Sequence, residues 1–319
     1  MGIIRRLFGR SGKEDDSAVM LPAIERAVLA VEPLLKQAGG YPQRYFKPVA
    51  AALDYAHRLA SEIPGPVAVD RVSYAGDAFV HALFPDVDAV SESLCTSVAV
   101  QDYLRDFPAS EEFYALMGMR RFEKTVVGME VVGQVVQHDV VQKAVYFTSH
   151  TIDNPASSEQ HAREQIAMSF FDSLARKIRK RVEERKQVMH DLVLEKDMLL
   201  ARMRVASAQD KPALEQELTK LLEKLQATVT SLEPGNYIDD FEAVMLRPQD
   251  HLYLKQDRIT LDSMGIRRPE DAGAGEAITF NQLIGYDRRD WTVTLVHCGR
   301  LQHESFADKL DKAYRRLAI

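Results

Sequence analysis

Three polar residues lie close enough in the sequence to hold a metal ion. His150, Asp153 and His161 surround the junction between a strand-like segment and a helical one. Imidazole and carboxylate groups are ordinary ligands of transition metals. Their spacing matches no known ligand pattern, and helix-capping and loop hydrogen bonds are the competing interpretation. We therefore expect no metal site here.

A second group could activate a nucleophile. His297, Cys298 and His303 place a thiol beside imidazoles, which is how a cysteine nucleophile is made. However, Cys298 ends an apolar alternating segment without an oxyanion motif, which favours a buried, reduced thiol. Cys95 also lies among apolar residues, and the two cysteines fit neither a disulfide framework nor a zinc pattern. Their use indicates a reducing cytoplasm.

The motifs of several common enzyme classes are missing from the sequence. There is no Gly-x-x-x-x-Gly-Lys phosphate loop, no Gly-x-Gly-x-x-Gly fingerprint and no Gly-x-Ser-x-Gly elbow. We therefore expect a protein that is not an enzyme, with no catalytic residue and no cofactor. An enzyme of unrecognised type remains the alternative.

A dense group of cations lies in the segment ARKIRKRVEERK, residues 175–186. On a helix, Ile178 and Val182 would face inward and the cations outward, as a surface for phosphate groups or an acidic protein. Nucleic acid is disfavoured by the net charge of −6 and by the lack of interleaved aromatic residues. The competing interpretation is a solvated helix face paired with nearby glutamates. The candidate residues for an anionic partner are Arg176, Lys177, Arg179, Lys180, Arg181, Arg185 and Lys186.

The first residues, MGIIRRLFGR, form a basic leader that we place at 1–16. Arginines interrupt its apolar residues, unlike the apolar run of a signal peptide. An amphipathic helix of this kind can lie reversibly on an anionic membrane surface. A leader without a specific role and a leader docked on the protein itself are the alternatives. The candidate membrane-contacting residues are Ile3, Ile4, Arg5, Arg6, Leu7, Phe8 and Arg10.

The elements that carry these groups begin with a predicted helical domain over 17–124, where apolar residues recur at helical spacing. Residues 125–150 are rich in Val and aromatic residues, and they predict a β-hairpin of strands 127–136 and 140–149 with a turn near Gln137–Asp139. Because an isolated hairpin is only marginally stable in water, we expect it to join the C-terminal strands.

A long helical hairpin is predicted over 158–233. Leucines recur at heptad-like spacing on both sides of the polar turn Ser207–Pro212, which is typical of an antiparallel coiled coil. Such an arm would contact a partner protein or form a homodimer.

The remainder, 236–319, is predicted to be rich in strands, at 241–246, 251–254, 258–261, 277–283 and 291–297, with a final helix at 304–317. The expected fold class is α+β, with a helical N-terminal bundle, a long antiparallel coiled-coil hairpin and a small C-terminal antiparallel β-barrel or sheet.

The segment DRITLDSMGIRRPEDAGAGEAITF gives a strand, a Ser-containing turn with Gly-Ile, a polar loop, Gly-Glu and an apolar strand. Over residues 240–299 this resembles PilZ-type barrels, which bind a cyclic dinucleotide through an Arg-x-x-x-Arg loop and an Asp-x-Ser-x-x-Gly turn. The resemblance places Asp262, Ser263 and Gly265 in that turn, with compressed spacing. Arg181 and Arg185 have the arginine spacing, but they lie far upstream in a helix. The resemblance implies a degenerate barrel whose ligand binding is lost or has turned to protein contact.

The sequence thus predicts a cytoplasmic, non-catalytic adaptor or regulatory protein that acts through its coiled-coil arm. The leader would recruit it to the inner face of the membrane. The alternative is a sensor that binds an anionic cyclic dinucleotide through the barrel.

Overall fold

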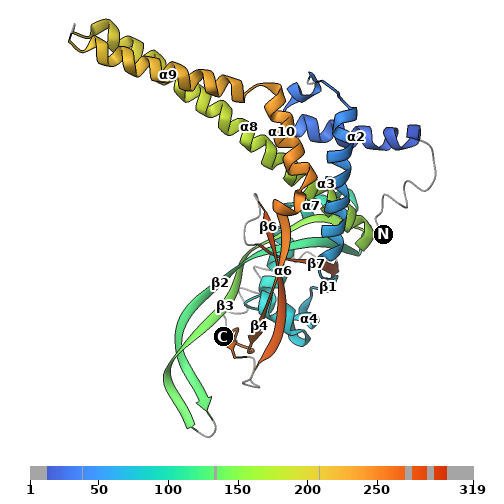
Figure 1. Ribbon diagram of the computed structural model, residues 1–319. Coiled ribbons are helices and arrows are strands. Elements are labelled where there is room, and N and C mark those ends of the chain that lie inside the picture. Colours follow the sequence, from blue (N-terminus) through green and yellow to red (C-terminus); the bar gives the residue numbers. More distant parts are fainter. Residues whose placement is uncertain are drawn as a thin grey trace. The chain divides into compact units, whose positions relative to one another are not determined.

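The computed structural model describes residues 13–37, 39–132, 135–207, 209–269, 275–285 and 291–299 (Figure 1). It contains both helices and an antiparallel, barrel-like sheet, which confirms the mixed fold class. The chain forms two compact units. We call them the helical unit (Met1–Arg58, Ala167–Tyr253 and Gly285–Asp287) and the sheet unit (Leu59–Ile166, Leu254–Ile284 and Arg288–Ile319).

Helices make up almost all of the helical unit. In chain order they are α2 (Lys13–Val31), η1 (Pro33–Gln37), α3 (Gln43–Glu62), α8 (Glu159–Val205), α9 (Lys211–Ser231), α10 (Pro234–Leu246) and η2 (Pro248–Asp250). The end of α3 and the start of α8 belong to the sheet unit. The apolar residues of α3 recur at steps of three and four, which gives the helix one buried face. On that face the Tyr45 ring lies 5.1 Å from the Phe241 ring, and the Tyr45 hydroxyl donates to the Leu35 carbonyl oxygen at 2.9 Å.

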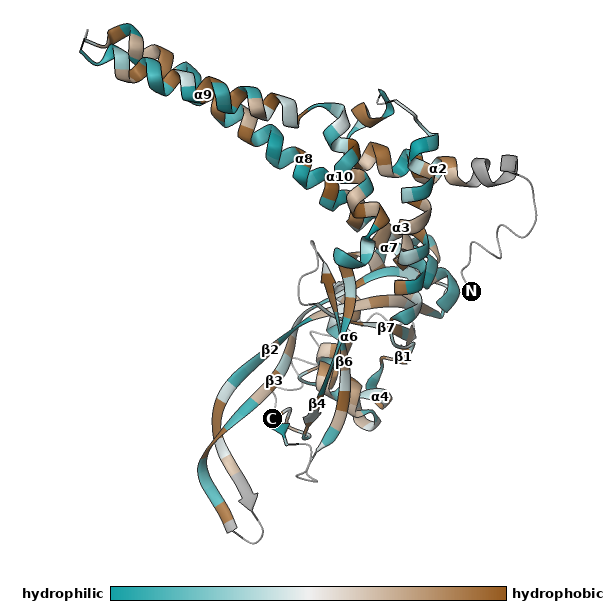
Figure 2. Ribbon diagram, in the orientation of Figure 1, coloured by the Kyte–Doolittle hydropathy of each residue, from teal (hydrophilic) through white to brown (hydrophobic). Residues whose placement is uncertain are grey.

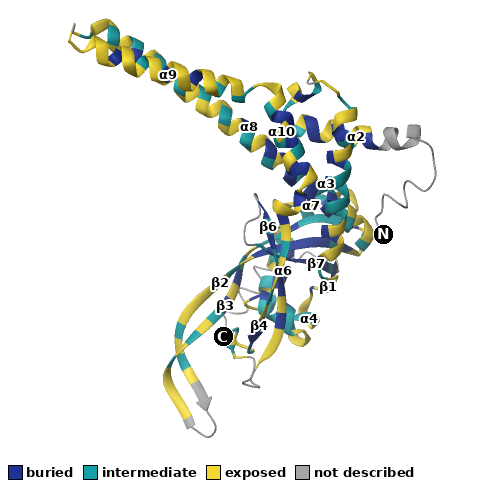
Figure 3. Cartoon of the chain, viewed as in Figure 1, coloured by how far each residue is buried: buried dark blue, intermediate teal, exposed yellow. Residues whose placement is uncertain are grey.

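The arm, 187–231, consists of the distal part of α8 and the whole of α9, which run side by side (Figure 1). A small apolar cluster joins them, with Leu199, Leu214 and Leu221 buried and Leu192, Met203 and Leu218 packed against them. The Ser207 hydroxyl donates to Asp210 at 2.7 Å in the connecting turn. Most of the arm is exposed (Figure 3).

The predicted strand over 241–246 is wrong, because these residues belong to helix α10. Pro234 occupies the first turn of this helix, where its missing N–H group has no cost. Ile238, Phe241 and Met245 follow at steps of three and four, and all three are buried. The helical period therefore describes this apolar segment better than the alternation of a strand.

Among the described residues, the sheet unit is built around seven strands. They are β1 (Val67–Ala68), β2 (Glu112–Val132), β3 (Val135–Ala156), β4 (Leu252–Leu261), β5 (Arg267–Arg268), β6 (Glu276–Gly285) and β7 (Trp291–Gly299). Their order is β3-β2-β7-β6-β4-β5, with β1 parallel to β7. β2 is antiparallel to β7, so the hairpin strands and the C-terminal strands form one sheet. A bridge between Ala144 and Ile266 links β3 to the chain beside β5 and nearly closes the barrel.

Four short helices pack on this sheet: α4 (Arg71–Gly76), α5 (Ala78–Leu83), α6 (Val87–Thr96) and α7 (Val98–Asp106). Each begins at a polar side chain, Asp70, Asp77, Asp86 or Ser97, that accepts a backbone N–H bond of the first turn. The buried side chains of α5, α6 and α7 join those of the sheet in one core, and the partly buried Tyr74 of α4 packs against it.

The predicted helical domain extends too far, and the predicted hairpin turn is misplaced. Residues 112–124 belong to β2, and β3 runs without a break through 137–139. The ladder pairs Val132 with Val135, so the strands are longer than predicted. Between 112 and 120 β2 lies between β3 and β7, and this pairing with residues distant in the sequence overrides its local helical pattern.

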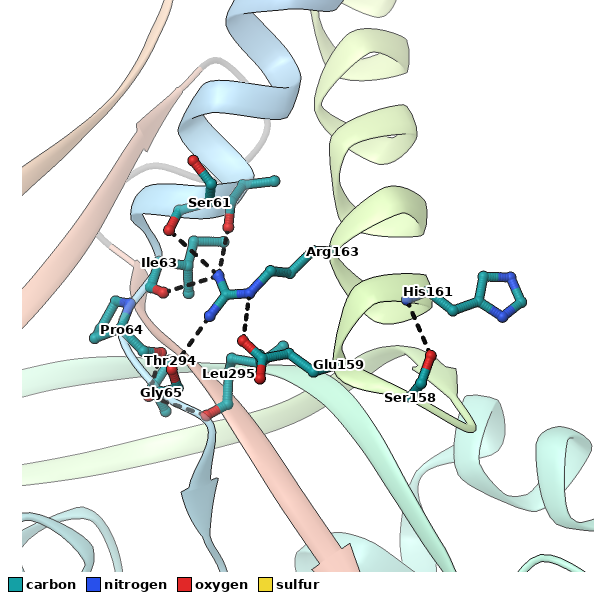
Figure 4. A network of polar contacts seen from close by, with 11 residues as sticks. Ser61, Ile63, Pro64, Gly65, Ser158, Glu159, His161, Arg163, Thr294 and Leu295 are labelled. Carbon is teal, nitrogen blue, oxygen red and sulfur yellow. Dashed lines mark hydrogen bonds and ion pairs between the residues drawn. The ribbon is translucent and has the colours of Figure 1, made fainter. Parts of the chain in front are cut away.

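Arg163, near the start of α8, connects the segments around it within the sheet unit (Figure 4). Its guanidinium donates to the carbonyl oxygens of Ala60 at 2.8 Å, Ile63 at 3.1 Å and Gly65 at 3.2 Å, and it pairs with Glu159 at 2.8 Å. A helix leaves its last carbonyl groups without intrahelical partners. Arg163 therefore satisfies the end of α3 and the turn that follows it.

That turn is fixed on its other side by strand β7. The Leu295 N–H donates to the Pro64 carbonyl oxygen at 2.8 Å (Figure 4). Gly65 has a φ of +112°, and a Cβ atom there would lie 2.2 Å from the Leu295 carbonyl oxygen. Only glycine fits this approach of two backbones.

Two predicted segments lie outside the described residues: the leader positions 1–12 and the helix at 304–317. Within the described part of the chain, no helix has the length and apolar character needed to cross a bilayer.

Candidate functional site

A cavity of about 1080 Å³ opens in the sheet unit. It is bounded by 74–85 of α4 and α5, by 145–148 of β3, and by 261–268, which form the end of β4, the β4–β5 turn and β5. The start of β6, 275–278, completes the wall. Segments from distant parts of the sequence therefore form this site.

Asp262, Ser263 and Gly265, the candidate ligand residues of the barrel, lie together in the β4–β5 turn and line the cavity. Asp262 Oδ1 accepts the N–H groups of Met264 and Ile266, both at 2.9 Å. Gly265 has a φ of +72° and donates its N–H to the Asp262 carbonyl oxygen at 2.9 Å. These residues thus stabilise the turn, and the Asp262 carboxylate is largely occupied by it.

Arg268, the arginine among the described lining residues, is held in an ion pair within the protein. Arg268 pairs with Asp262 Oδ2 at 2.9 Å, and the two side chains are only 13% and 17% exposed. Nearby in the sheet unit, Arg121 pairs with Asp257 at 2.6 Å. A mostly buried, hydrogen-bonded ion pair is costly to separate, so Arg268 is not available to an external anion.

His81 of α5 reaches across to the β4–β5 turn. Its Nε2 lies 3.1 Å from the Ser263 carbonyl oxygen, and its Nδ1 lies 3.3 Å from the Tyr74 carbonyl oxygen. A neutral imidazole donates from one nitrogen only, so it can make one of these bonds at a time. Sequence reasoning missed His81, because no local pattern links it to Ser263.

The basic run lies on α8, where it is largely paired within the chain. Arg179 and Lys180 pair with Glu183 and Glu184 at 2.7 and 3.6 Å. Arg181 and Arg185 both reach Asp240, at 3.5 and 2.5 Å, and Lys186 pairs with Glu32. Arg176 and Lys177 also have interactions within the protein. This arrangement matches the solvated, paired helix face more closely than a free anionic-partner surface.

The first histidine group is dispersed by the fold. His150 Nε2 lies 2.8 Å from the Leu83 carbonyl oxygen, its ring stacks on Phe84, and burial lowers its pKa. His161 lies in the first turn of α8, where its N–H donates to the Ser158 hydroxyl at 3.3 Å. In the part of the chain that the structure describes, no three His, Cys, Asp or Glu side chains gather as metal ligands.

The thiol of Cys298 is fully buried, and burial raises its pKa to about 12. It is therefore protonated at neutral pH and unsuited to nucleophilic attack. Its neighbour His297 pairs with Glu112 at 2.8 Å and stacks on Tyr114. His303 lies outside the described residues.

Comparison of the chain with protein-family models, with curated proteins and with solved structures finds no match. The function is therefore inferred from the residues themselves.

Proposed function

We propose that this chain is a non-catalytic adaptor or regulatory protein that acts through its arm, and that a second copy of the chain is the partner of the arm. The supporting observation is a set of exposed apolar residues on the arm outside the seam that joins α8 to α9. Apart from Val188 at the start of the arm, they are Leu194, Met198 and Val205 on α8, and Leu222 and Val229 on α9, with exposed fractions between 48% and 86%.

The spacing of these residues is that of a helical contact. Leu194 precedes Met198 by four positions, Met198 precedes Val205 by seven, and Leu222 precedes Val229 by seven. Positions that recur by four and seven residues form a stripe along a helix, and such stripes pack against further helices. Hydrophobic residues are visible along much of the arm in Figure 2.

The buried seam between the two helices is small for an element of this length. The cluster contains three buried leucines, and a two-helix hairpin shields only one side of each helix. Further helices that pack on the arm would cover the exposed stripes. A second copy supplies apolar residues of matching type and spacing, because the two sides of an isologous contact are identical.

The surface area that the arm can bury determines how stable the dimer should be. The 21 residues of α9 extend about 32 Å, and two adjacent helices are roughly 20 Å wide, so one face of the arm offers about 600 Å². Stable interfaces bury about 800 Å² per partner. We therefore expect a reversible dimer that dissociates on dilution.

Sedimentation equilibrium over a range of concentrations tests this proposal. The double variant Leu222→Lys/Val229→Lys should be monomeric at concentrations where the unmodified protein is dimeric, because two buried ammonium groups would oppose association. Val72→Lys is the matched control, since Val72 is 80% exposed on α4 and remote in sequence from the arm. The control should dimerise normally. A monomeric unmodified protein, or a double variant that dimerises as well as the control, would overturn the proposal.

A further inference from the structure

The cavity of the sheet unit has the size and lining of a small-molecule site. Its volume of about 1080 Å³ reaches the upper end of ligand pockets, which span roughly 300–1,000 Å³. Five of its lining residues are apolar and buried: Phe84, Val145, Phe147, Leu261 and Ile278. An apolar molecule in this site would contact apolar side chains, and this contact removes apolar surface from water.

Polar and charged groups lie among the more exposed lining residues, and they give the cavity a negative character. The charged residues are the carboxylates Asp77, Asp262 and Glu276 and the guanidinium of Arg268. Arg268 and Asp262 neutralise each other at 2.9 Å. Asp77 and Glu276 are exposed, and Asp77 Oδ1 accepts the N–H groups of Phe79 and Val80 at the start of α5, at 2.8 and 3.4 Å. Both carry a formal negative charge, and the described lining residues hold no Lys or Arg other than Arg268 to balance them. The potential at this site therefore repels anions and attracts cations.

Aromatic rings add to the attraction for a cation. Tyr74 and His81 contribute to the wall, and their ring centroids lie 4.8 Å apart. The faces of tyrosine rings carry negative charge density and bind ammonium groups, more strongly where water is excluded.

From these observations we propose that the cavity binds an organic cation with an apolar, aromatic body. The body would rest on the buried apolar residues, and the cationic group would lie near Asp77 and Glu276. This ligand differs in charge from an anionic nucleotide, for which the cavity has no free cation among its described lining residues. The inference does not depend on the arm.

Two probes with the same ring and opposite charge test the proposal. Binding of benzyltrimethylammonium and of benzenesulfonate to the full chain would be measured by ligand-observed NMR at low and moderate salt. We expect the ammonium to bind about tenfold more tightly than the sulfonate, and its binding to weaken with salt. Equal binding of the two, or tighter binding of the sulfonate, would overturn the proposal, and the second result would favour an anionic ligand.

Three variants test whether the ammonium probe binds in this cavity. Glu276→Gln removes one of the uncompensated charges, and we expect it to weaken ammonium binding about threefold. Glu92→Gln is the matched control, because Glu92 is exposed on α6 and does not line the cavity. Ser263→Trp adds a large side chain at an exposed lining residue, and it should abolish binding. If both Glu276→Gln and Ser263→Trp bind the ammonium like the control, binding occurs elsewhere and the proposal is wrong.

Discussion

The arm and the barrel-like sheet are stabilised in different ways. In the arm, the buried residues Leu199, Leu214 and Leu221 lie on either side of a single turn. In the sheet, β2 pairs with β7, so that Phe113 lies opposite Cys298. Contacts that are local in sequence form and break locally, whereas contacts between distant segments join a larger cooperative region. The two regions should therefore respond differently to the same kind of damage.

The largest expected effect is the loss of an aromatic side chain from the sheet core. Phe280 is fully buried, and its ring lies 5.1 Å from that of Phe147 and 5.6 Å from that of Phe79. Phe280→Ala should lower the free energy of unfolding by about 3–5 kcal/mol. Leu221→Ala in the arm should cost only about 1–2 kcal/mol, because its cluster is small.

Urea denaturation and amide hydrogen exchange would measure this difference. We expect Phe280→Ala to raise exchange throughout the sheet unit, and Leu221→Ala to raise it only within the arm. Comparable losses of stability in the two variants, or exchange that spreads from the arm over the sheet unit, would show that the two regions do not differ in this way.

A smaller effect should follow from replacing Arg163. In Arg163→Met, the carbonyl oxygens of Ala60, Ile63 and Gly65 lose their shared donor, and we expect a loss of about 2–3 kcal/mol in the free energy of unfolding. Arg179→Met is the matched control, because Arg179 forms an exposed pair with Glu183 within one helix. It should cost less than about 0.5 kcal/mol. Equal thermal shifts in the two variants would contradict this assignment.

The smallest effect concerns pH. Burial lowers the pKa of His150 in the folded state, so the unfolded state binds a proton more readily. The contribution of neutral His150 to the free energy of unfolding is thus fully present well above a pH of about 6.5, and it is lost as the pH falls below that value. Urea denaturation between pH 8 and 5 should show less acid sensitivity in His150→Gln than in the control His161→Gln. The same pH dependence of stability in both variants would show that groups other than His150 cause the acid sensitivity.

Heptad spacing indicated helices over the arm, and α8 and α9 are there, because helix formation depends on residues near each other in sequence. The helix predicted over 112–124 is wrong because these residues pair with β3 and β7. A strand pairing with distant residues cannot be recognised from the residues of one segment alone. The strand predicted over 241–246 is wrong because a short apolar segment fits either period. The resemblance to PilZ-type barrels named Asp262, Ser263 and Gly265 as turn residues, and they lie in the β4–β5 turn. The cavity around them could not be predicted, since α5 brings His81 to Ser263 from a distant segment.

Helix α8 is continuous from Glu159 to Val205, and within the helical unit it carries both the buried Val182 and the distal seam with α9. Each residue advances a helix by about 100°, so one residue inserted after Val182 would turn the seam away from α9. Seven residues return it to within roughly 20° of its first orientation. Changes in the length of the arm should therefore be tolerated where they bring the seam back to α9, at about 7, 11 or 18 residues, and only when α8 and α9 change together. Related proteins with longer or shorter arms should differ by paired steps of these sizes.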